Sequence, residues 1–102
     1  MAQLIALYQK PQDAAAFDRY YYSTHVPLAK TVPGLRSYTV SEGVVASGAG
    51  PSNVHLVAIL EFDSMGAIQQ ALGSAEGQAI AADLGNFAQA GVELLMFDSR
   101  EV

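Results

Sequence analysis

A short stretch, residues 20–38, gathers one histidine and four tyrosines that could carry out proton transfer. His25 follows Tyr21 by four residues, so on a helix the two side chains lie one turn apart and can touch. An ordinary imidazole titrates near neutral pH, which makes His25 the candidate acid or base. A structural alternative is that the imidazole caps the helix by bonding a backbone carbonyl. Tyr20 and Tyr22 point away from the His25 stripe and are expected to serve packing.

Other polar residues carry weaker signals. Arg36 could hold a substrate carboxylate, although a pair with a surface acid is the competing explanation. Glu61 is a second candidate base. No carboxylate adjacent in sequence orients His25, because Asp18 lies seven residues back, on nearly the same face but roughly 10 Å along the axis. His55 begins a strand and is expected at the surface or at a barrel mouth.

The residue types present argue against a cofactor or a metal. The chain has no cysteine, and its two histidines are far apart in sequence without clustered carboxylates, so we expect no metal site. No glycine-rich loop has the helix and lysine that phosphate binding requires. Nothing indicates a flavin, nicotinamide or haem cofactor.

The helix that carries His25 is predicted to begin after Asp13, a suitable N-cap. Phe17, Tyr21 and His25 then recur every four residues on one helical stripe. Pro27 has no N–H to donate to the carbonyl four residues earlier and disfavours helical geometry in the residue before it. We therefore expect His25 to lie at or beside a kink or break.

Alternating or continuous apolar residues predict strands over four ranges: 3–9, 35–45, 54–63 and 91–98. Residues 46–53 lack core-forming side chains and are expected to be a flexible connection. Ser64 and Ser74 are predicted to cap two further helices, over 65–72 and roughly 75–89. With right-handed crossovers, this β-α-β-β-α-β order predicts an α+β ferredoxin-like sandwich with a four-stranded antiparallel sheet.

The composition predicts one domain that needs a partner. The chain has 102 residues, of which 51% are hydrophobic and only 15% charged. The predicted strands are apolar on both faces, whereas helices cover only one, so we expect a homodimer with two sheets face to face. The net charge of −5 without a basic cluster argues against nucleic-acid and anionic-membrane partners. No apolar run is long enough to span a membrane and no signal peptide is evident, so we expect a cytoplasmic protein.

Two motifs in the first half of the chain stand out together: Tyr21-x-x-x-His25-x-Pro27-Leu28-Ala29 and Pro33-Gly34-Leu35-Arg36-x-Tyr38. They resemble the EthD family, small dimeric α+β barrel proteins named for an ethyl tert-butyl ether degradation locus. The later segment 74–84 looks like the second helical region of that family. The family includes lactone isomerases and fungal decarboxylase-like or dehydratase-like enzymes, and its wider superfamily includes cofactor-free monooxygenases.

The resemblance implies a pocket between the sheet and the first helix for a small hydrophobic, aromatic or carbonyl-bearing ligand. His25 and Tyr38 match the histidine and tyrosine that line the active pocket of related lactone isomerases, so we expect them to be catalytic. The expected substrate-binding residues are Phe17, Tyr21, Leu28 and Arg36.

Three functions follow from this resemblance. The first is cofactor-free proton transfer, as in an isomerase, cyclase, dehydratase or decarboxylase. Because the chain has no cysteine, no proton can be relayed through a thiol. The second is a non-catalytic binding or accessory protein with the same pocket, and the third is a cofactor-free monooxygenase.

Overall fold

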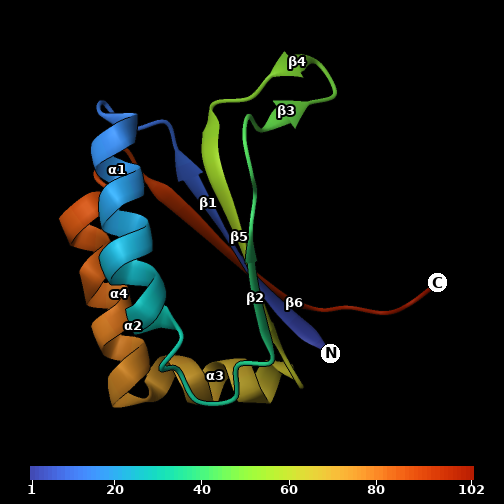
Figure 1. Ribbon diagram of the computed structural model, residues 1–102. Coiled ribbons are helices and arrows are strands. Elements are labelled where there is room, and N and C mark those ends of the chain that lie inside the picture. The colour runs from blue at the N-terminus through green and yellow to red at the C-terminus, as the bar shows by residue number, and fades with distance from the viewer.

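The computed structural model describes residues 1–102 and places all helices on one face of a four-stranded antiparallel sheet (Figure 1). The strands run in the order β2-β5-β1-β6, with these bounds: β1 (Ala2–Gln9), β2 (Ser37–Val40), β5 (Val54–Phe62) and β6 (Val92–Asp98). Every neighbouring pair is antiparallel. This is the ferredoxin-like arrangement, so the predicted α+β sandwich is confirmed.

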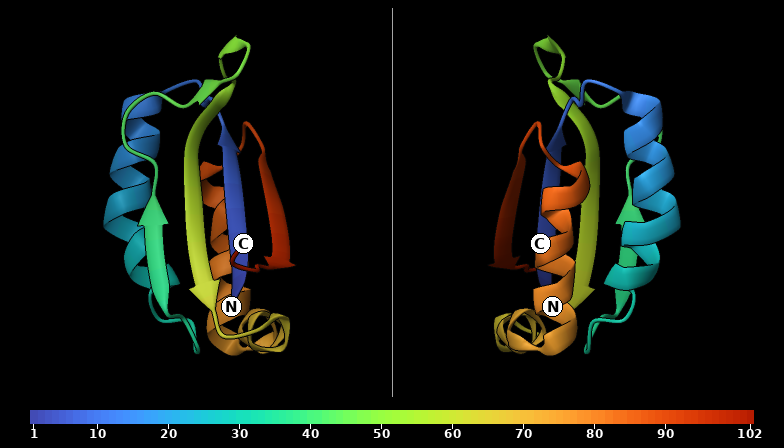
Figure 2. Two further views of the ribbon diagram at one scale, coloured as in Figure 1. Left: turned by 90° about the vertical axis from the view of Figure 1, so that its right-hand side faces the viewer. Right: turned by 90° about the vertical axis from the view of Figure 1, so that its left-hand side faces the viewer.

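The two faces of the sheet differ in what covers them. Figure 2 shows the helices against one face and no helix against the other. On β1 the buried residues alternate with half-buried ones, since Leu4, Ala6 and Tyr8 face the helices and Ile5 and Leu7 face away. None of the helices is long and apolar enough to cross a membrane.

The first helical region is continuous and contains a wide turn. It consists of α1 (Ala14–Tyr20), the π-helical turn η1 (Tyr21–His25) and α2 (Val26–Ala29). Asp13 caps α1 as predicted, with its carboxylate accepting from the backbone N–H of Ala16 at 3.0 Å. Of the predicted kink or break beside Pro27, the break is wrong, because the helical region continues through this residue. The N–H of Val26 reaches back five residues to Tyr21, and Pro27 then falls in the first turn of α2, where a missing N–H is tolerated.

The second helical region contains α3 (Met65–Gly73) and α4 (Ala75–Phe87). Both predicted caps are present: Ser64 accepts from the backbone N–H of Ala67, and Ser74 accepts from that of Gly77, each at 3.0 Å. The two helices meet at a sharp corner after Gly73. There, Gly77 lies so close to the end of α3 that a Cβ atom would fall 2.0 Å from the carbonyl oxygen of Ala71.

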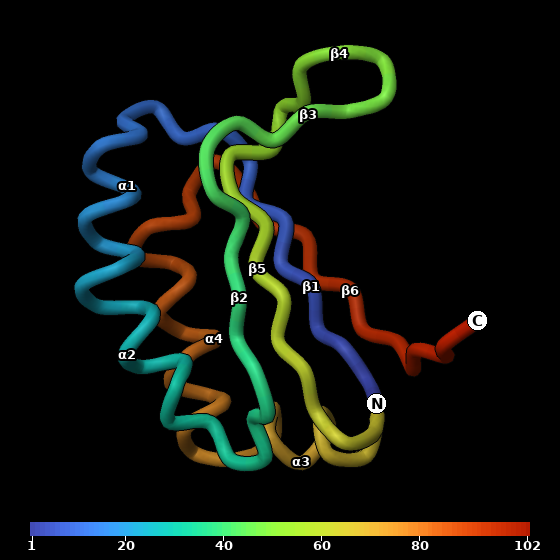
Figure 3. Tube along the Cα trace, turned by 45° about the vertical axis from the view of Figure 1, so that its right-hand side comes forward, coloured from blue at the N-terminus to red at the C-terminus, as the bar shows by residue number.

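The second strand is shorter than the predicted range of 35–45. β2 ends at Val40, and Gly43, with a φ of 76°, turns the chain away from the sheet, a conformation that glycine adopts without strain. The expected flexible connection at 46–53 contains a small hairpin of β3 (Ala46–Ser47) and β4 (Gly50–Pro51), which projects beyond the end of the main sheet (Figure 3).

Two groups of buried residues form the core between helices and sheet. One centres on the aromatic rings of Tyr8, Phe17, Tyr21 and Phe87, whose centroids lie 5.3–5.8 Å apart, most of them edge to face. The other packs Phe62 and other apolar side chains beneath α3. Burying a large apolar side chain stabilises the fold by about 1.5–3 kcal/mol. The aromatic group therefore fixes η1, and with it His25, against the sheet.

Candidate functional site

His25 is buried and is paired with a carboxylate from the other helical region. Its Nδ1 atom lies 2.9 Å from Oδ2 of Asp83 on α4. Their exposed fractions are only 3% and 7%. The imidazole therefore bonds a carboxylate, so the structural alternative of a cap on a backbone carbonyl is wrong.

Asp83 collects three hydrogen bonds inside the protein. The hydroxyl of Tyr20 donates to Oδ1 at 2.5 Å and the amide of Asn86 donates to the same oxygen at 3.0 Å, while His25 bonds Oδ2. Burial alone would raise the pKa of this carboxyl, but the bonds from Tyr20, Asn86 and His25 together hold it below the ordinary 3.8. The carboxylate is thus ionised at neutral pH and accepts the Nδ1 proton of His25. Tyr20 was expected to pack with its hydroxyl satisfied, and its ring does stack on Phe87 while its hydroxyl bonds this carboxylate.

This pairing leaves the second ring nitrogen of His25 available. Every fully buried side-chain nitrogen or oxygen has a hydrogen-bond partner, but Nε2 has none within the protein. Nε2 therefore keeps a small accessible surface, and His25 lines a cavity. With Nδ1–H directed at a carboxylate, the neutral imidazole presents an unprotonated Nε2, the form that can act as a general base.

Tyr21 packs on His25, as the four-residue helix spacing predicts, and its hydroxyl also meets that of Tyr38. The hydroxyls of Tyr21 and Tyr38 lie 2.6 Å apart, and the ring of Tyr21 stacks on that of His25 with centroids 5.5 Å apart. Burial raises the pKa of both tyrosines, so both remain neutral. The bond between two hydroxyls uses only one of their two hydrogens, so the accepting hydroxyl keeps one hydrogen to donate elsewhere.

A cavity of about 80 Å³ connects these groups. The only polar side chains in its lining are those of His25, Tyr8, Tyr21 and Tyr38, and it contains no Asp, Glu, Lys or Arg. Its walls come from the sheet, η1, α2, α3 and α4, whereas we expected the sheet and the first helix alone. The difference arises because α3 and α4 cover the same face of the sheet. The exposed residues of the lining mark its mouth, namely Leu72, Ala81 and Leu94.

Three of the six expected site residues lie outside this cavity. Phe17 is buried in the aromatic core and contributes to a separate groove. Leu28 is half-buried on α2 and lines neither space. Arg36 is exposed and forms a two-pronged ion pair with Asp63, at 2.9 and 2.8 Å, which is the competing explanation given for it above. The structure thus brings together His25, Tyr21 and Tyr38 only.

Two further candidates lie in unrelated places. Glu61 is on the helix-free face, where it accepts hydrogen bonds from Gln3 and Ser37, so it does not face the cavity. In a regular alternating strand His55 would share that face with Glu61, but the pairing of β1 with β5 shifts register after Tyr8. This irregularity turns His55 toward α1, where its Nε2 lies 2.8 Å from Asp18. No three His, Asp or Glu side chains converge as a metal site would require.

Asp83 is the residue that sequence reasoning missed. It lies three residues after Ile80 and four before Phe87, on the apolar stripe of α4. A carboxylate on such a stripe must find a buried partner, because an unpaired buried charge is costly. The position of Asp83 on an apolar stripe could therefore have indicated a buried ion pair, but it could not identify His25 as the partner.

Comparison with known proteins gives close matches over almost the whole chain. The EthD domain family matches residues 9–91. An uncharacterized 11.0 kDa protein of the thcB-thcC intergenic region of Rhodococcus erythropolis is 38% identical over 102 residues, which cover 100% of this chain and 98% of that protein. An ethyl tert-butyl ether degradation (EthD) family protein from Bacillus halodurans C-125 is 37% identical, with a TM-score of 0.89 over 98% of this chain and 99% of the other.

Two more distant structures share the fold alone. SnoaB, a cofactor-independent oxygenase from Streptomyces nogalater, is 15% identical, with a TM-score of 0.69 over 99% of this chain and 94% of that one. A dimeric ferredoxin-like protein of unknown function from Thermobifida fusca YX is 14% identical, with a TM-score of 0.67 over 94% and 88% of the two chains.

Proposed function

Because the chain belongs to the EthD family, we propose that it binds a small, largely apolar, carbonyl-bearing metabolite and catalyses a proton transfer without a cofactor. The observation that carries this proposal is the buried pair of His25 and Asp83, which leaves Nε2 at a cavity that also contains the hydroxyl pair of Tyr21 and Tyr38. The absence of charged side chains from the cavity favours a neutral ligand.

The chemistry follows from the positions of these groups. Nε2 of His25 takes a proton from the carbon next to the substrate carbonyl, while Asp83 stabilises the imidazolium that forms. The free hydrogen of the Tyr21–Tyr38 pair donates to the carbonyl oxygen, on which negative charge develops. The imidazolium then returns the proton to the same carbon or to another one. Return to another carbon is isomerisation, and the same first step begins a dehydration.

The size of the cavity limits the ligand. Sites for metabolites usually enclose about 300–1,000 Å³, whereas this cavity encloses about 80 Å³. As it stands it accepts only a few non-hydrogen atoms. A larger substrate has to displace side chains at the mouth, where Leu72 and Leu94 are 39% and 43% exposed.

The proposal includes a homodimer in which two sheets pack face to face. Its support is the helix-free face of the sheet, which carries Ile5, Leu7, Val57 and Ile59 with no covering element. The dimeric ferredoxin-like neighbour described above has the same fold.

The base role of His25 can be tested without the natural substrate. Cyclopentanone in deuterated buffer exchanges its α-hydrogens when a base removes them, and proton NMR follows the exchange. We expect the wild-type protein to accelerate this exchange over buffer, and His25→Gln and His25→Ala to lose about 100-fold or more of the acceleration, as removal of a general base does. Equal acceleration by wild type and His25→Gln would overturn the proposal.

Two controls separate the alternative functions. Chemical-shift titration with cyclopentanone, and with cyclopentane as the analogue without a carbonyl, reports binding independently of exchange. Binding without exchange in the wild type would support a non-catalytic binding protein. Oxygen uptake with a quinol, lost in His25→Gln, would support the cofactor-free monooxygenase.

A further inference from the structure

We propose that Tyr20 and Asn86 are positioning residues for His25, acting through Asp83. They hold one carboxylate oxygen so that the other stays against Nδ1 of His25 and Nε2 remains the proton acceptor at the cavity. The role rests on the proposed use of His25 as the base. It assigns a purpose to two side chains that line no part of the cavity.

The hydrogen bonds divide the Asp83 carboxylate between two sides. Oδ1 accepts from the Tyr20 hydroxyl at 2.5 Å and from the Asn86 amide at 3.0 Å. Oδ2 lies 2.9 Å from Nδ1 of His25. A carboxylate attached through a single rotatable bond can turn about it, and two donors on one oxygen, from different helices, oppose that rotation.

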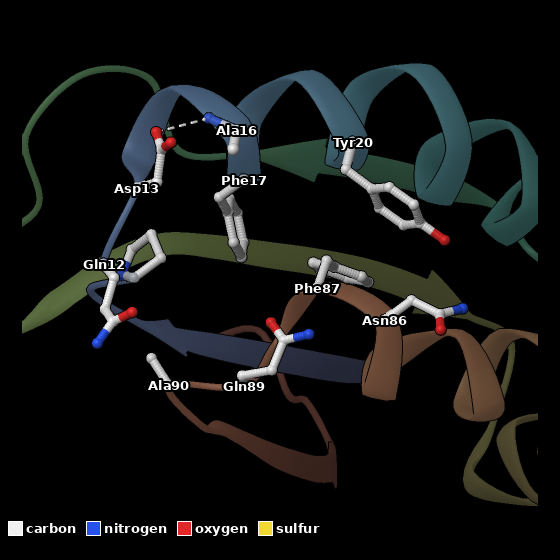
Figure 4. Close-up of a pocket in the computed structure, with 10 residues that line it drawn as sticks. Gln12, Asp13, Ala16, Phe17, Tyr20, Asn86, Phe87, Gln89 and Ala90 are labelled. Atoms are coloured by element: carbon white, nitrogen blue, oxygen red, sulfur yellow. Dashed lines mark hydrogen bonds between the residues drawn. The ribbon is translucent and has the colours of Figure 1, made fainter.

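Each donor comes from a separate, well-supported element. Tyr20 ends α1 and its ring stacks on Phe87 with centroids 5.4 Å apart, while Asn86 lies three residues after Asp83 on α4. Figure 4 shows the Tyr20 hydroxyl and the Asn86 amide at the same end of the groove between α1 and α4. Asp83 thus joins α1, η1 and α4 through its three partners. By fixing the Asp83 carboxylate, Tyr20 and Asn86 keep the His25 ring in the orientation that the reaction needs.

The consequence concerns the tautomer of His25. If the carboxylate turned away, the imidazole would lose the acceptor that keeps its proton on Nδ1. The proton could then move to Nε2, and the ring nitrogen at the cavity would no longer accept a proton. Tyr20 and Asn86 therefore affect the reaction without touching the substrate.

The groove makes the test feasible. Asn86 is exposed and Tyr20 is half-buried at the groove, whose volume is about 610 Å³. Tyr20→Phe removes the hydroxyl and keeps the ring on Phe87, and Asn86→Ala removes the amide at an exposed position. Tyr22→Phe is the matched control, because Tyr22 is a neighbouring tyrosine, 50% exposed, that bonds no part of Asp83.

The experiment measures the nitrogen-15 chemical shifts of the His25 ring across pH, together with the cyclopentanone exchange described above. In the wild type and in Tyr22→Phe we expect the neutral ring to carry its proton on Nδ1. In the double variant Tyr20→Phe/Asn86→Ala we expect a mixture of tautomers, and a loss of exchange rate of about tenfold or more with unchanged ligand affinity. The single variants should lie between these limits.

Two outcomes separate this inference from the proposed function. If the double variant keeps the Nδ1–H tautomer and the wild-type exchange rate while His25→Gln abolishes exchange, the positioning role is wrong and the base role stands. If the tautomer shifts as expected but His25→Gln exchanges as fast as wild type, the positioning role is right and the base role is wrong. A fold check by amide NMR ensures that neither result reflects unfolding.

Discussion

The tyrosines of the cavity should make the protein sensitive to alkali. Burial raises the pKa of Tyr8, Tyr21 and Tyr38 above the ordinary 10.0. Above pH 10 the unfolded chain releases these protons and the native protein keeps them, so the free energy of unfolding falls as pH rises. Each tyrosine adds about 1.4 kcal/mol per pH unit to that slope.

Removing one hydroxyl should therefore reduce the slope. Between pH 10 and pH 11.5 the free energy of unfolding should fall less steeply in Tyr21→Phe than in wild type. Urea unfolding at each pH measures this slope. Phe17→Leu also disturbs the aromatic core but removes no titrating group, so it should keep the wild-type slope. An unchanged slope in Tyr21→Phe would show that this hydroxyl ionises as readily in the folded protein as in the unfolded chain.

At the scale of single residues, local spacing predicted some contacts of the site and could not predict others. The approach of Tyr21 to His25 follows from a four-residue helical spacing, and the structure confirms it. Asp83 and His25 are 58 residues apart, and their contact depends on how α4 crosses η1. The sequence could not show which of the three consecutive tyrosines supports the site, because the partner of the Tyr20 hydroxyl lies 63 residues away.

Among the elements, the π-helical turn sets the direction of His25. Residues four apart on an α-helix are separated by about 40° more than a full turn, so two such steps would rotate His25 by about 80° from Phe17. A π turn holds more residues than an α turn, because its hydrogen bonds span five positions instead of four. Each residue therefore rotates the chain less, which offsets part of the rotation of about 80°. The rings accordingly stack in sequence, Phe17 on Tyr21 at 5.8 Å and Tyr21 on His25 at 5.5 Å.

The corner between α3 and α4 depends on a missing side chain. We expect Gly77→Ala to lower the free energy of unfolding by about 1–3 kcal/mol, because its Cβ would meet the Ala71 carbonyl and force the helices apart. At Gly85 on the same helix an added Cβ would have no atom within 4 Å, so Gly85→Ala should raise the free energy of unfolding by about 0.5–1 kcal/mol. Denaturant unfolding measures both. A neutral Gly77→Ala would mean that the two helices can separate at little cost.

Element boundaries were predictable where a local signal fixed them. Asp13, Ser64 and Ser74 cap the helices at the predicted positions, because capping depends on bonds within one turn. The outcome at Pro27 was not predictable in this way, since whether a helix breaks or widens depends on what packs against its far side. The register shift that turns His55 toward α1 likewise arises from pairing between strands.

For the whole molecule, the helix-free face predicts self-association. Light scattering at micromolar concentration should give twice the protomer mass of 10.7 kDa. Leu95 lies on this face and is 44% exposed, so Leu95→Glu should dissociate the dimer without disturbing the protomer core. Leu72→Glu alters a leucine of similar exposure, 39%, on the helix side and should leave the mass unchanged. A wild-type monomer would rule out the paired sheets.

The place of β1 in the sheet also bears on how the chain folds during synthesis. Ala2 pairs with Phe62 on one side and with Asp98 on the other. During synthesis β1 therefore stays unpaired until β5 and β6 have been made. Contacts between residues so distant in sequence form slowly, and an unpaired strand edge can meanwhile join another chain. A chain released before β6 is made would keep β1 open along that edge. Such fragments should aggregate more readily than chains in which β6 is paired with that edge of β1.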